Sequence, residues 1–152
     1  MNFLTEAANI EEFHRKNRDV AFVDTPVLYR EYTTPHVIVM EYIDGFSIDD
    51  KENLQENGYD LNEVGSKLID NFIKQVMVDG FFHADPHAGN IILKDGVIYF
   101  IDLGMVGRMS SHDRGIVKDM IFAVAEGDVR DLIPIHEPPE RFDRFGAFCF
   151  GE

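Results

Sequence analysis

The spacing of apolar residues along the chain predicts two amphipathic helices in its first half. Between residues 2 and 15, apolar or small residues recur at three- and four-residue intervals, at Phe3, Ala7, Ile10 and Phe13, which is the period of one helix face. A longer helix is predicted after Asp60, a residue type that caps helices, and it ends at Asp79 and Gly80. Its apolar face comprises Leu61, Val64, Leu68, Phe72, Ile73, Val76 and Met77.

A β-hairpin is predicted in the second half. Two β-prone apolar runs, 91–93 and 97–101, flank the short segment Lys94-Asp95-Gly96, in which we expect glycine at positive φ. The hairpin sets Asn90 at the entrance of the first strand and Asp102 at the exit of the second. Neighbouring strands lie about 5 Å apart, so both side chains are expected at the open end of one ribbon, within reach of one cation.

Weaker patterns complete the picture of an α+β fold. The end of the chain carries aromatic residues without a clear period, and we expect it to be irregular. The pattern predicts strands at 26–32 and 37–45, a short acidic helix at 47–57, a helix from Ser110 or Ser111 that closes near Gly127, and the irregular end at 134–152.

Length and composition are those of a single domain. The 152 residues, 45% of them hydrophobic and 13 of them Phe, are enough to fill one core. Acidic residues outnumber basic ones by 28 to 14, for a net charge of −14. This balance argues against a nucleic-acid partner, because phosphate contacts need clustered Lys and Arg. An anionic nucleotide would need its magnesium to approach such a chain.

Signals for secretion and membrane insertion are missing from the sequence. Cys149 is the single cysteine and cannot form an internal disulfide, which is consistent with a reducing compartment. The N-terminus lacks the apolar core of a signal peptide. No run approaches the ~18 apolar residues of a membrane span. We therefore expect a cytoplasmic chain with no membrane span of its own.

Residues 83–104 hold the candidate chemistry, with Asp85, then Asn90 five residues later, then Asp102 after the hairpin. Phosphoryl transfer needs one carboxylate to orient the attacking hydroxyl and a pair of oxygen ligands to hold magnesium on the nucleotide phosphates. An amide and a carboxylate oxygen suit magnesium, which takes its remaining ligands from water and phosphate. Pro86 and Gly89 bend the loop and are expected to aim Asp85 toward the metal.

This segment resembles the catalytic and magnesium loops of the protein-kinase-like fold, and most closely those of the UbiB family of atypical kinases. Protein kinases carry His-Arg-Asp, an Asn five residues after the Asp, and Asp-Phe-Gly. Here the corresponding residues are His-Ala-Asp at 83–85, Asn90 and Asp-Leu-Gly at 102–104. The form His-Ala-Asp-Pro-His and the continuation Asp-Leu-Gly-Met-Val-Gly are typical of UbiB, whereas Ala88 stands where that family usually carries Pro.

The resemblance implies a role for each residue of the segment. Asp85 would be the catalytic base or the acid that orients the hydroxyl, and Asn90 and Asp102 would hold Mg²⁺ beside ATP. His87 would donate a hydrogen bond to the transferring phosphoryl group, and His83 would buttress the loop.

Residues 37–45 resemble the kinase hinge. Backbone groups near Glu41 and Ile43 would bind the adenine edge, with Met40 at the back of the nucleotide pocket. The alternative from the residues alone is a buried strand that leads into a turn.

Glu6 resembles the glutamate that the kinase-like fold carries on a helix in this place, where it pairs with a Lys from an earlier strand. Only five residues precede Glu6, so that Lys is not at its usual position here, and neither a glycine-rich loop nor the Lys-x-Gly-Gln motif of UbiB is present. The alternative is a surface glutamate on an amphipathic helix.

By this resemblance, residues 1–152 would be a partial UbiB-like kinase domain with a helix of the αC type, a hinge, a mainly helical C-lobe and a truncated N-lobe. We expect such a chain to be inactive alone. The resemblance links it to ubiquinone or isoprenoid-lipid metabolism, with lipid or isoprenoid-quinone pathway proteins as partners beside the nucleotide. Membrane-anchoring segments of the full-length protein would lie beyond Glu152.

Three other interpretations stay open. A small-molecule kinase of the aminoglycoside or choline type also uses His-x-Asp and Asn. A non-catalytic nucleotide-binding or interaction module would retain the motifs without turnover. A metal hydrolase is a third interpretation, because His83, Asp85 and His87 alternate, although Pro86 interrupts a regular strand there.

Overall fold

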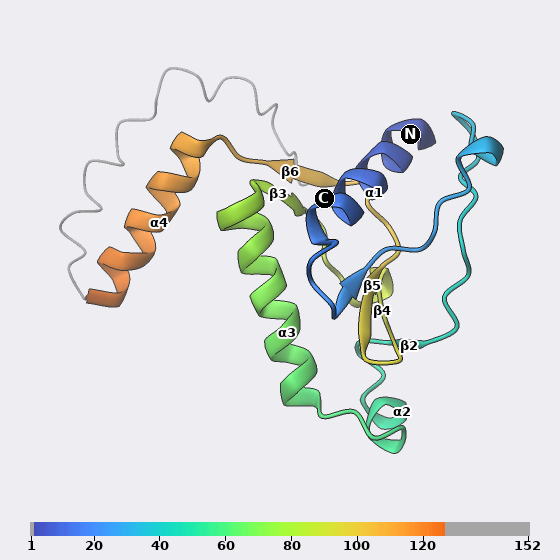
Figure 1. The fold of residues 1–152 in the computed structure, drawn as a ribbon. Coiled ribbons are helices and arrows are strands. Elements are labelled where there is room, and N and C mark those ends of the chain that lie inside the picture. Colours follow the sequence, from blue (N-terminus) through green and yellow to red (C-terminus); the bar gives the residue numbers. More distant parts are fainter. Residues whose placement is uncertain (1, 127–152) are drawn as a thin grey trace, which may run out of the picture. The chain divides into compact units, whose positions relative to one another are not determined.

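The computed structural model describes residues 2–126 of the chain. They fall into two units, one that ends at Arg114 and one that starts at Gly115. The first unit contains every strand of the described residues, together with helices α1 and α3 (Figure 1). The second begins within helix α4 (Ser111–Glu126), the helix that the sequence predicts from Ser110 or Ser111.

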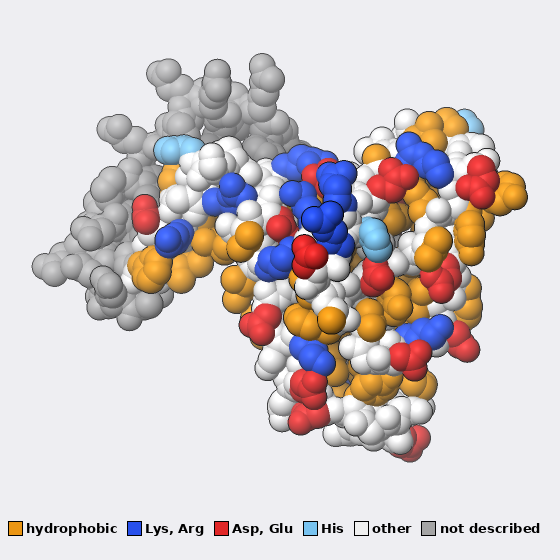
Figure 2. All heavy atoms as spheres, viewed as in Figure 1, with side chains coloured by type: hydrophobic (Ala, Val, Ile, Leu, Met, Phe, Trp, Pro, Cys, Tyr) orange, Lys and Arg blue, Asp and Glu red, His pale blue; other side chains and the backbone are white. Residues whose placement is uncertain are grey.

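Helix α1 (Phe3–Asn17) confirms the first predicted helix. The side chain of Asn2 caps it by accepting a hydrogen bond from the Leu4 N–H at 3.0 Å. Its apolar face is buried at Ala7, Ile10 and Phe13. The last turn is basic, which suits the negative end of the helix dipole, and Lys and Arg side chains gather over this end of α1 in Figure 2.

The hairpin is confirmed and forms the centre of a four-stranded sheet of order β1-β5-β4-β2. Its turn places both Asp95 (φ 51) and Gly96 (φ 79) in the left-handed region, as a two-residue hairpin turn requires. Parallel pairing joins β1 to β5, and antiparallel pairing joins β2 to β4 and β4 to β5. The strands are β1 (Val23–Asp24), β2 (Phe46–Ser47), β4 (Ile91–Lys94) and β5 (Val97–Phe100).

The predicted long helix is α3 (Leu61–Ile73), and the side chain of Asp60 caps it as expected. The chain continues into a π-helical turn, η2 (Lys74–Asp79), and leaves it at Gly80 in the left-handed conformation (φ 60). A two-stranded antiparallel ribbon follows, formed by β3 (Phe81–His83) and β6 (Val106–Arg108). This ribbon and the hairpin together carry the candidate segment.

The acidic helix is shorter than the sequence predicts. Helix α2 (Lys51–Glu56) starts after its cap Asp50, because Phe46 and Ser47 pair with β4 instead of entering the helix. Asp50 accepts a hydrogen bond from the Asn53 N–H at 3.3 Å, which fixes the first turn.

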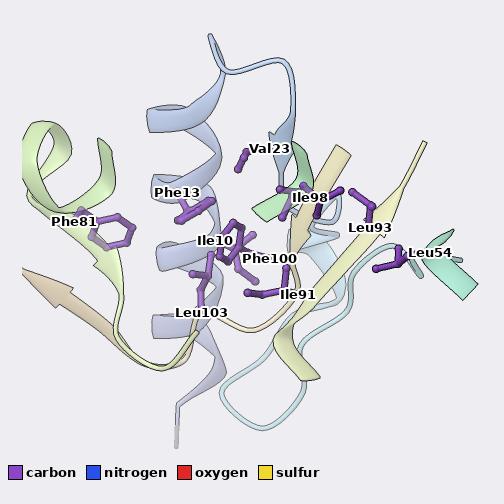
Figure 3. Close-up of a cluster of buried hydrophobic side chains, with 11 residues drawn as sticks. Ile10, Phe13, Val23, Leu54, Phe81, Ile91, Leu93, Ile98, Phe100 and Leu103 are labelled. Atoms are coloured by element: carbon purple, nitrogen blue, oxygen red, sulfur yellow. The ribbon is translucent and has the colours of Figure 1, made fainter. Parts of the chain in front are cut away.

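One hydrophobic core joins α1 to the hairpin (Figure 3). Phe13 of α1 packs on Phe100 of β5, with ring centroids 4.9 Å apart. Leu103, just after the hairpin, is fully buried in the same cluster. The remaining buried members are Ile10, Val23, Leu54, Val64, Phe81, Ile91, Leu93 and Ile98.

The prediction of regular strands at 26–32 and 37–45 is wrong. These segments make isolated bridges between Leu28 and Met40 and between Thr34 and Val37, with a 3₁₀ turn, η1 (Arg30–Tyr32), between them. Their β-prone residues lack a continuous ladder, because β-propensity is realised only against a neighbouring strand. The predicted helix end at Gly127 and the irregular end at 134–152 lie outside the described residues.

Within residues 2–126, every helix is too short or too polar to cross a bilayer.

Candidate functional site

The hairpin brings Asn90 and Asp102 to the same end of the sheet, as the sequence predicts. A backbone hydrogen bond of 3.0 Å runs from the Ile101 N–H to the Asn90 carbonyl and extends the β4–β5 pairing by one step. Asn90 itself closes a 3₁₀ turn, η3 (Ala88–Asn90), by donating its N–H to the His87 carbonyl at 3.0 Å. Asn90 and Asp102 therefore lie at the same end of the hairpin, with Asp102 directly after Ile101, the residue that faces Asn90.

The turn that carries Asp102 is held from both sides. Its carboxylate oxygen Oδ1 accepts a hydrogen bond from the Gly104 N–H at 2.8 Å. The carbonyl of Leu103 accepts one from the side-chain amide of Asn9 on α1 at 2.9 Å. Both Asn9 and Leu103 are buried, so helix α1 fixes the position of the Asp102 turn.

Asp85 reaches the same region through the β3–β6 ribbon. His83 pairs with Val106, and the Ala84 N–H donates to the Met105 carbonyl at 3.0 Å. These contacts lay the Asp85 loop along residues 102–105. The Asp85 carboxylate is more than half exposed, and its Oδ2 lies 3.8 Å from His87 Nε2. The carboxylate is thus open to an incoming hydroxyl group.

His83 is a buried, structural residue, as its expected role implies. Its ring nitrogen Nδ1 accepts a hydrogen bond from the Asp85 N–H at 3.1 Å. Burial lowers the pKa of His83 and outweighs the charges of Asp102 and Asp85, which raise it. The ring is therefore neutral near pH 7 and acts as an acceptor that orients the Asp85 backbone.

The metal-hydrolase interpretation is wrong. Nδ1 of His83 is taken by Asp85, and the ring is only 1% exposed. Among residues 2–126, no three His, Cys, Asp or Glu side chains gather in a way that could hold a metal ion. His83, Asp85 and His87 therefore do not form a shared coordination site.

Glu6 is buried and faces the Asp102 side of the site, so its interpretation as a surface residue is wrong. It is only 5% exposed, and its Oε2 lacks a hydrogen-bond partner among the described residues. Burial raises the pKa of Glu6, and the negative charge of Asp102 raises it further. A cationic group bound between the two carboxylates would relieve both effects.

The segment predicted as a hinge lies against the hairpin. Glu41 donates its N–H to the Val27 carbonyl at 2.8 Å, and Met40 packs on the core. No described residue hydrogen-bonds to the Glu41 carbonyl or the Ile43 N–H. At Gly45, an added Cβ would sit 2.6 Å from the Leu93 carbonyl oxygen, so only glycine fits this approach to β4.

The residues at the site fit a magnesium ion that is shared with phosphates. Asn90 and Asp102 supply an amide and a carboxylate oxygen, which are hard ligands that suit Mg²⁺. Two protein ligands are few, but magnesium commonly completes its octahedron with water and nucleotide phosphate oxygens. The donor set thus matches a nucleotide-bound ion better than a metal caged by protein alone.

Sequence reasoning missed several polar residues that hold this site. The Ser47 hydroxyl lies 2.6 Å from Asp49 Oδ1 and 3.1 Å from the Ala88 carbonyl, two acceptors that share its one proton, and so lies between β2 and the loop before Asn90. Asn9 and Asn71 are buried amides with partners 94 and 54 positions away, and Gln75 is a buried amide that bonds Asn71 and the His83 N–H. One signal was available: Asn71 and Gln75 continue the helical spacing of Val64 and Leu68, so they are polar residues at core-facing positions.

Comparison with known proteins finds similar sequences over most of this chain. A family model described as the ABC1 atypical kinase-like domain matches residues 1–136. An uncharacterized protein from the hydrogenase 1 5′ region of Clostridium pasteurianum is 42% identical over 135 residues, which cover 89% of this chain and 26% of that protein. The chloroplastic protein 'Activity of bc1 complex kinase 8' of Arabidopsis thaliana is 37% identical over 131 residues, which cover 84% of this chain and 17% of that protein.

A probable protein kinase UbiB from Tolumonas auensis is 31% identical over 141 residues, which cover 90% of this chain and 26% of that protein. The chain therefore spans about a quarter or less of the length of these relatives. A solved structure, the complex of Rv3197 and erythromycin from Mycobacterium tuberculosis, is similar to this chain at a TM-score of 0.60 and 24% identity. The alignment covers 88% of this chain and 34% of the Rv3197 chain. At that identity the likeness concerns the fold.

Proposed function

The chain belongs to the ABC1 atypical kinase-like family, and from that premise we propose that residues 83–104 bind magnesium and ATP for phosphoryl transfer. In this proposal Asp85 orients the attacking hydroxyl, and Asn90 and Asp102 hold the metal. The observation that carries the proposal is the hydrogen bond from the Ile101 N–H to the Asn90 carbonyl. It supports the proposal because it brings the backbone of Asn90 to the same end of the hairpin as Asp102.

The proposed reaction uses these groups in a simple way. The Asp85 carboxylate accepts the proton of the attacking hydroxyl as its oxygen forms a bond to the γ-phosphorus of ATP. The bond between that phosphorus and the bridging oxygen breaks, and ADP leaves with the electron pair. Bound Mg²⁺ would supply charge neutralisation on the phosphates. His87, close to Asp85 and more than half exposed, would donate a hydrogen bond to the transferring phosphoryl group.

The adenine of ATP would lie against residues 40–43. The Glu41 carbonyl and the Ile43 N–H are an acceptor and a donor without a backbone hydrogen bond among the described residues, and such a pair would suit the edge of an adenine ring. Met40, partly buried against the core, would line the back of this pocket. Gly45 then lets the chain approach β4, which connects the adenine pocket to the hairpin that carries Asn90 and Asp102.

Glu6 completes the proposed site from the α1 side. Burial raises the pKa of its carboxyl and the charge of Asp102 raises it further, so a cation close to it would favour the ionised form. In the kinase-like fold a lysine from an earlier strand pairs with this glutamate, and we propose that Glu6 receives such a side chain. Its contribution would be to orient the nucleotide phosphates.

The acceptor and the pathway are wider proposals, because the chain spans only part of its relatives. Relatives named UbiB support a link to ubiquinone or isoprenoid-lipid metabolism, with a lipid-pathway protein as partner. Water is also a competent acceptor for this chemistry, in which case the same groups would hydrolyse ATP.

The test is ATP turnover by the intact protein that contains this chain. Replacing the Asp85 carboxylate by an amide (Asp85→Asn) should lower kcat by roughly 10²–10⁴, the range for loss of a general base, while ATP still binds. Asp102→Asn should weaken magnesium-dependent ATP binding as well. Asp70→Asn, an exposed residue of α3, serves as the matched control and should behave as the wild type.

Two outcomes would contradict the proposal. Turnover that survives Asp85→Asn would remove Asp85 from the reaction. ATP binding without any turnover, in wild type and Asp85→Asn alike, would favour the non-catalytic nucleotide-binding module.

A further inference from the structure

A buried chain of side-chain amides connects α1 to the loop of Asp85. Asn17 Nδ2 donates to the Phe13 carbonyl at 3.0 Å, and Asn71 Nδ2 donates to Asn17 Oδ1 at 2.8 Å. Gln75 Nε2 donates to Asn71 Oδ1 at 2.7 Å. Gln75 Oε1 accepts from the His83 N–H at 3.0 Å. The three amide side chains come from residues that are at most 2% exposed.

The direction of every hydrogen bond in this chain is fixed by its two ends. The Phe13 carbonyl can only accept, and the His83 N–H can only donate. Each amide between them donates on one side and accepts on the other. Turning any one amide over would set two donors or two acceptors against each other, so the chain has a single satisfied arrangement.

The series of buried amides ends at His83, which is one hydrogen bond away from Asp85. It fixes the backbone of His83, whose ring packs on Phe100 with centroids 5.8 Å apart. The same ring accepts from the Asp85 N–H at 3.1 Å. A shift of Gln75 therefore moves His83, and a shift of His83 moves the backbone that presents the Asp85 carboxylate.

Gln75 owes its position to the π-helical turn η2. This turn, Lys74–Asp79, widens the helix at the end of α3 and ends at Gly80 with φ 60. The chain then reverses into β3, so that Gln75 meets His83 eight residues later. Turns of this type are rare and occur mostly at functional sites.

Stability alone does not account for three buried amides. Apolar side chains of similar size would fill the same space without the cost of removing polar groups from water. A fully satisfied polar network instead specifies one geometry. One end of this amide network is the Phe13 carbonyl, an ordinary helix carbonyl. The other end is the His83 N–H, next to Asp85, and this is the end where a single fixed geometry matters.

We propose that Asn17, Asn71 and Gln75 are positioning residues that set the Asp85 carboxylate for phosphoryl transfer through the His83 backbone and ring. This inference rests on the proposed role of Asp85. The three residues touch neither nucleotide nor metal, so they act on the rate of the chemical step and leave nucleotide affinity unchanged.

Two substitutions at Gln75 test this in the intact protein. Gln75→Met keeps the length of the side chain and removes both hydrogen bonds. We expect kcat for ATP turnover to fall roughly tenfold to a hundredfold, the cost of a small misplacement of a reacting group, with KM for ATP unchanged. Gln55→Met, on the exposed face of α2, is the matched control and should leave both constants as in the wild type.

Gln75→Glu gives a pH-dependent readout. Its hydrogen-bond partners are uncharged, namely the Asn71 amide and the His83 N–H, so burial raises the pKa of the introduced carboxyl. While protonated, this carboxyl donates to Asn71 Oδ1 and accepts from the His83 N–H, as Gln75 does. We expect kcat near that of the wild type at low pH, falling toward that of Gln75→Met as the carboxyl ionises. Gln55→Glu should follow the wild-type pH profile.

Amide hydrogen exchange provides a readout that does not depend on turnover. The His83 and Asp85 amide protons should exchange faster in Gln75→Met than in the wild type, while exchange in β4 and β5 stays unchanged. Should Gln75→Met fail to fold, Gln75→Glu compared at low and high pH makes the same test.

The results separate this inference from the proposed function. If Asp85→Asn abolishes turnover while Gln75→Met has wild-type kcat, the positioning role is overturned and the proposed function stands. If Gln75→Met and Gln75→Glu lose stability and activity equally at every pH, the amides are only structural and the inference is wrong. If the wild type lacks turnover, the proposed function fails, and unchanged exchange at His83 and Asp85 would overturn the inference as well.

Discussion

Asn9 on helix α1 donates a 2.9 Å hydrogen bond from its side-chain amide to the carbonyl of Leu103. The two residues are 94 positions apart and both are buried. This bond fastens the helix that carries Glu6 to the turn that carries Asp102.

Asn9→Leu keeps the volume of the side chain and leaves the Leu103 carbonyl buried without its donor. An unsatisfied buried carbonyl costs about 1–3 kcal/mol, so the free energy of unfolding should fall by that amount in urea titration. Asn62→Leu, on an exposed position of α3, should change it by no more than about 0.5 kcal/mol. Equal effects of the two substitutions would show that the bond to Leu103 does not stabilise the turn.

Replacement by alanine should have opposite effects on stability at Gly45 and Gly65. At Gly45 an added Cβ would lie 2.6 Å from the Leu93 carbonyl and 2.8 Å from the Ile92 side chain, so the hinge segment must move off β4. Gly45→Ala should destabilise the chain by about 1–3 kcal/mol, as overpacking does. At Gly65, within α3, an added Cβ meets nothing within 4 Å. Gly65→Ala should stabilise by roughly 0.5–1 kcal/mol.

Thermal or urea unfolding of both alanine variants makes this check. A neutral Gly45→Ala would contradict the close approach of Gly45 to β4, and destabilisation by Gly65→Ala would contradict the open space beside Gly65.

The ion pair between Glu12 and Arg108 makes stability depend on acid pH. The guanidinium of Arg108 donates two hydrogen bonds to the Glu12 carboxylate, at 3.0 and 2.6 Å, and lowers the pKa of Glu12 from its ordinary value of 4.5. Because the folded pKa lies below the unfolded one, the contribution is present above about pH 4.5 and is lost as pH falls through the folded pKa. Glu12→Gln should therefore cost about 1 kcal/mol or less at pH 7.

The difference between Glu12→Gln and the wild type should shrink toward zero in urea titrations at progressively lower pH. Glu11→Gln is the control, because Glu11 pairs with Arg30 at 3.2 Å with both side chains half exposed. We expect it to cost less at pH 7. A cost of Glu12→Gln that is the same at pH 7 and at strongly acid pH would mean that the charge of Glu12 is not responsible.

Local signals in the sequence were enough for the elements that carry the site. The Asp95-Gly96 turn fixes the hairpin register, and one further step of this register puts Asn90 opposite Ile101, the residue before Asp102. Asp60 marks the start of α3 by its own side-chain hydrogen bonds. Each of these features depends on residues within a few positions of one another.

The features that could not be predicted depend on distant partners. Residues 37–45 have strand composition but no continuous ladder, and a ladder depends on a neighbouring strand rather than on propensity. Asn71 pairs with Asn17 across 54 positions, and no local pattern shows such a pairing. The burial of Glu6 near Asp102 likewise follows from tertiary packing, whereas the local sequence by itself favours a surface glutamate.

The central claim is that Asn90 and Asp102 hold magnesium on a bound nucleotide, and calorimetric titration of ATP into the intact protein tests it most directly. We predict that chelating Mg²⁺ weakens ATP binding by at least roughly tenfold, or about 1.4 kcal/mol, and that Asp102→Asn does the same in the presence of Mg²⁺. Asp70→Asn should bind as the wild type does. An ATP affinity that is equal with and without Mg²⁺, or unchanged by Asp102→Asn, would contradict the account.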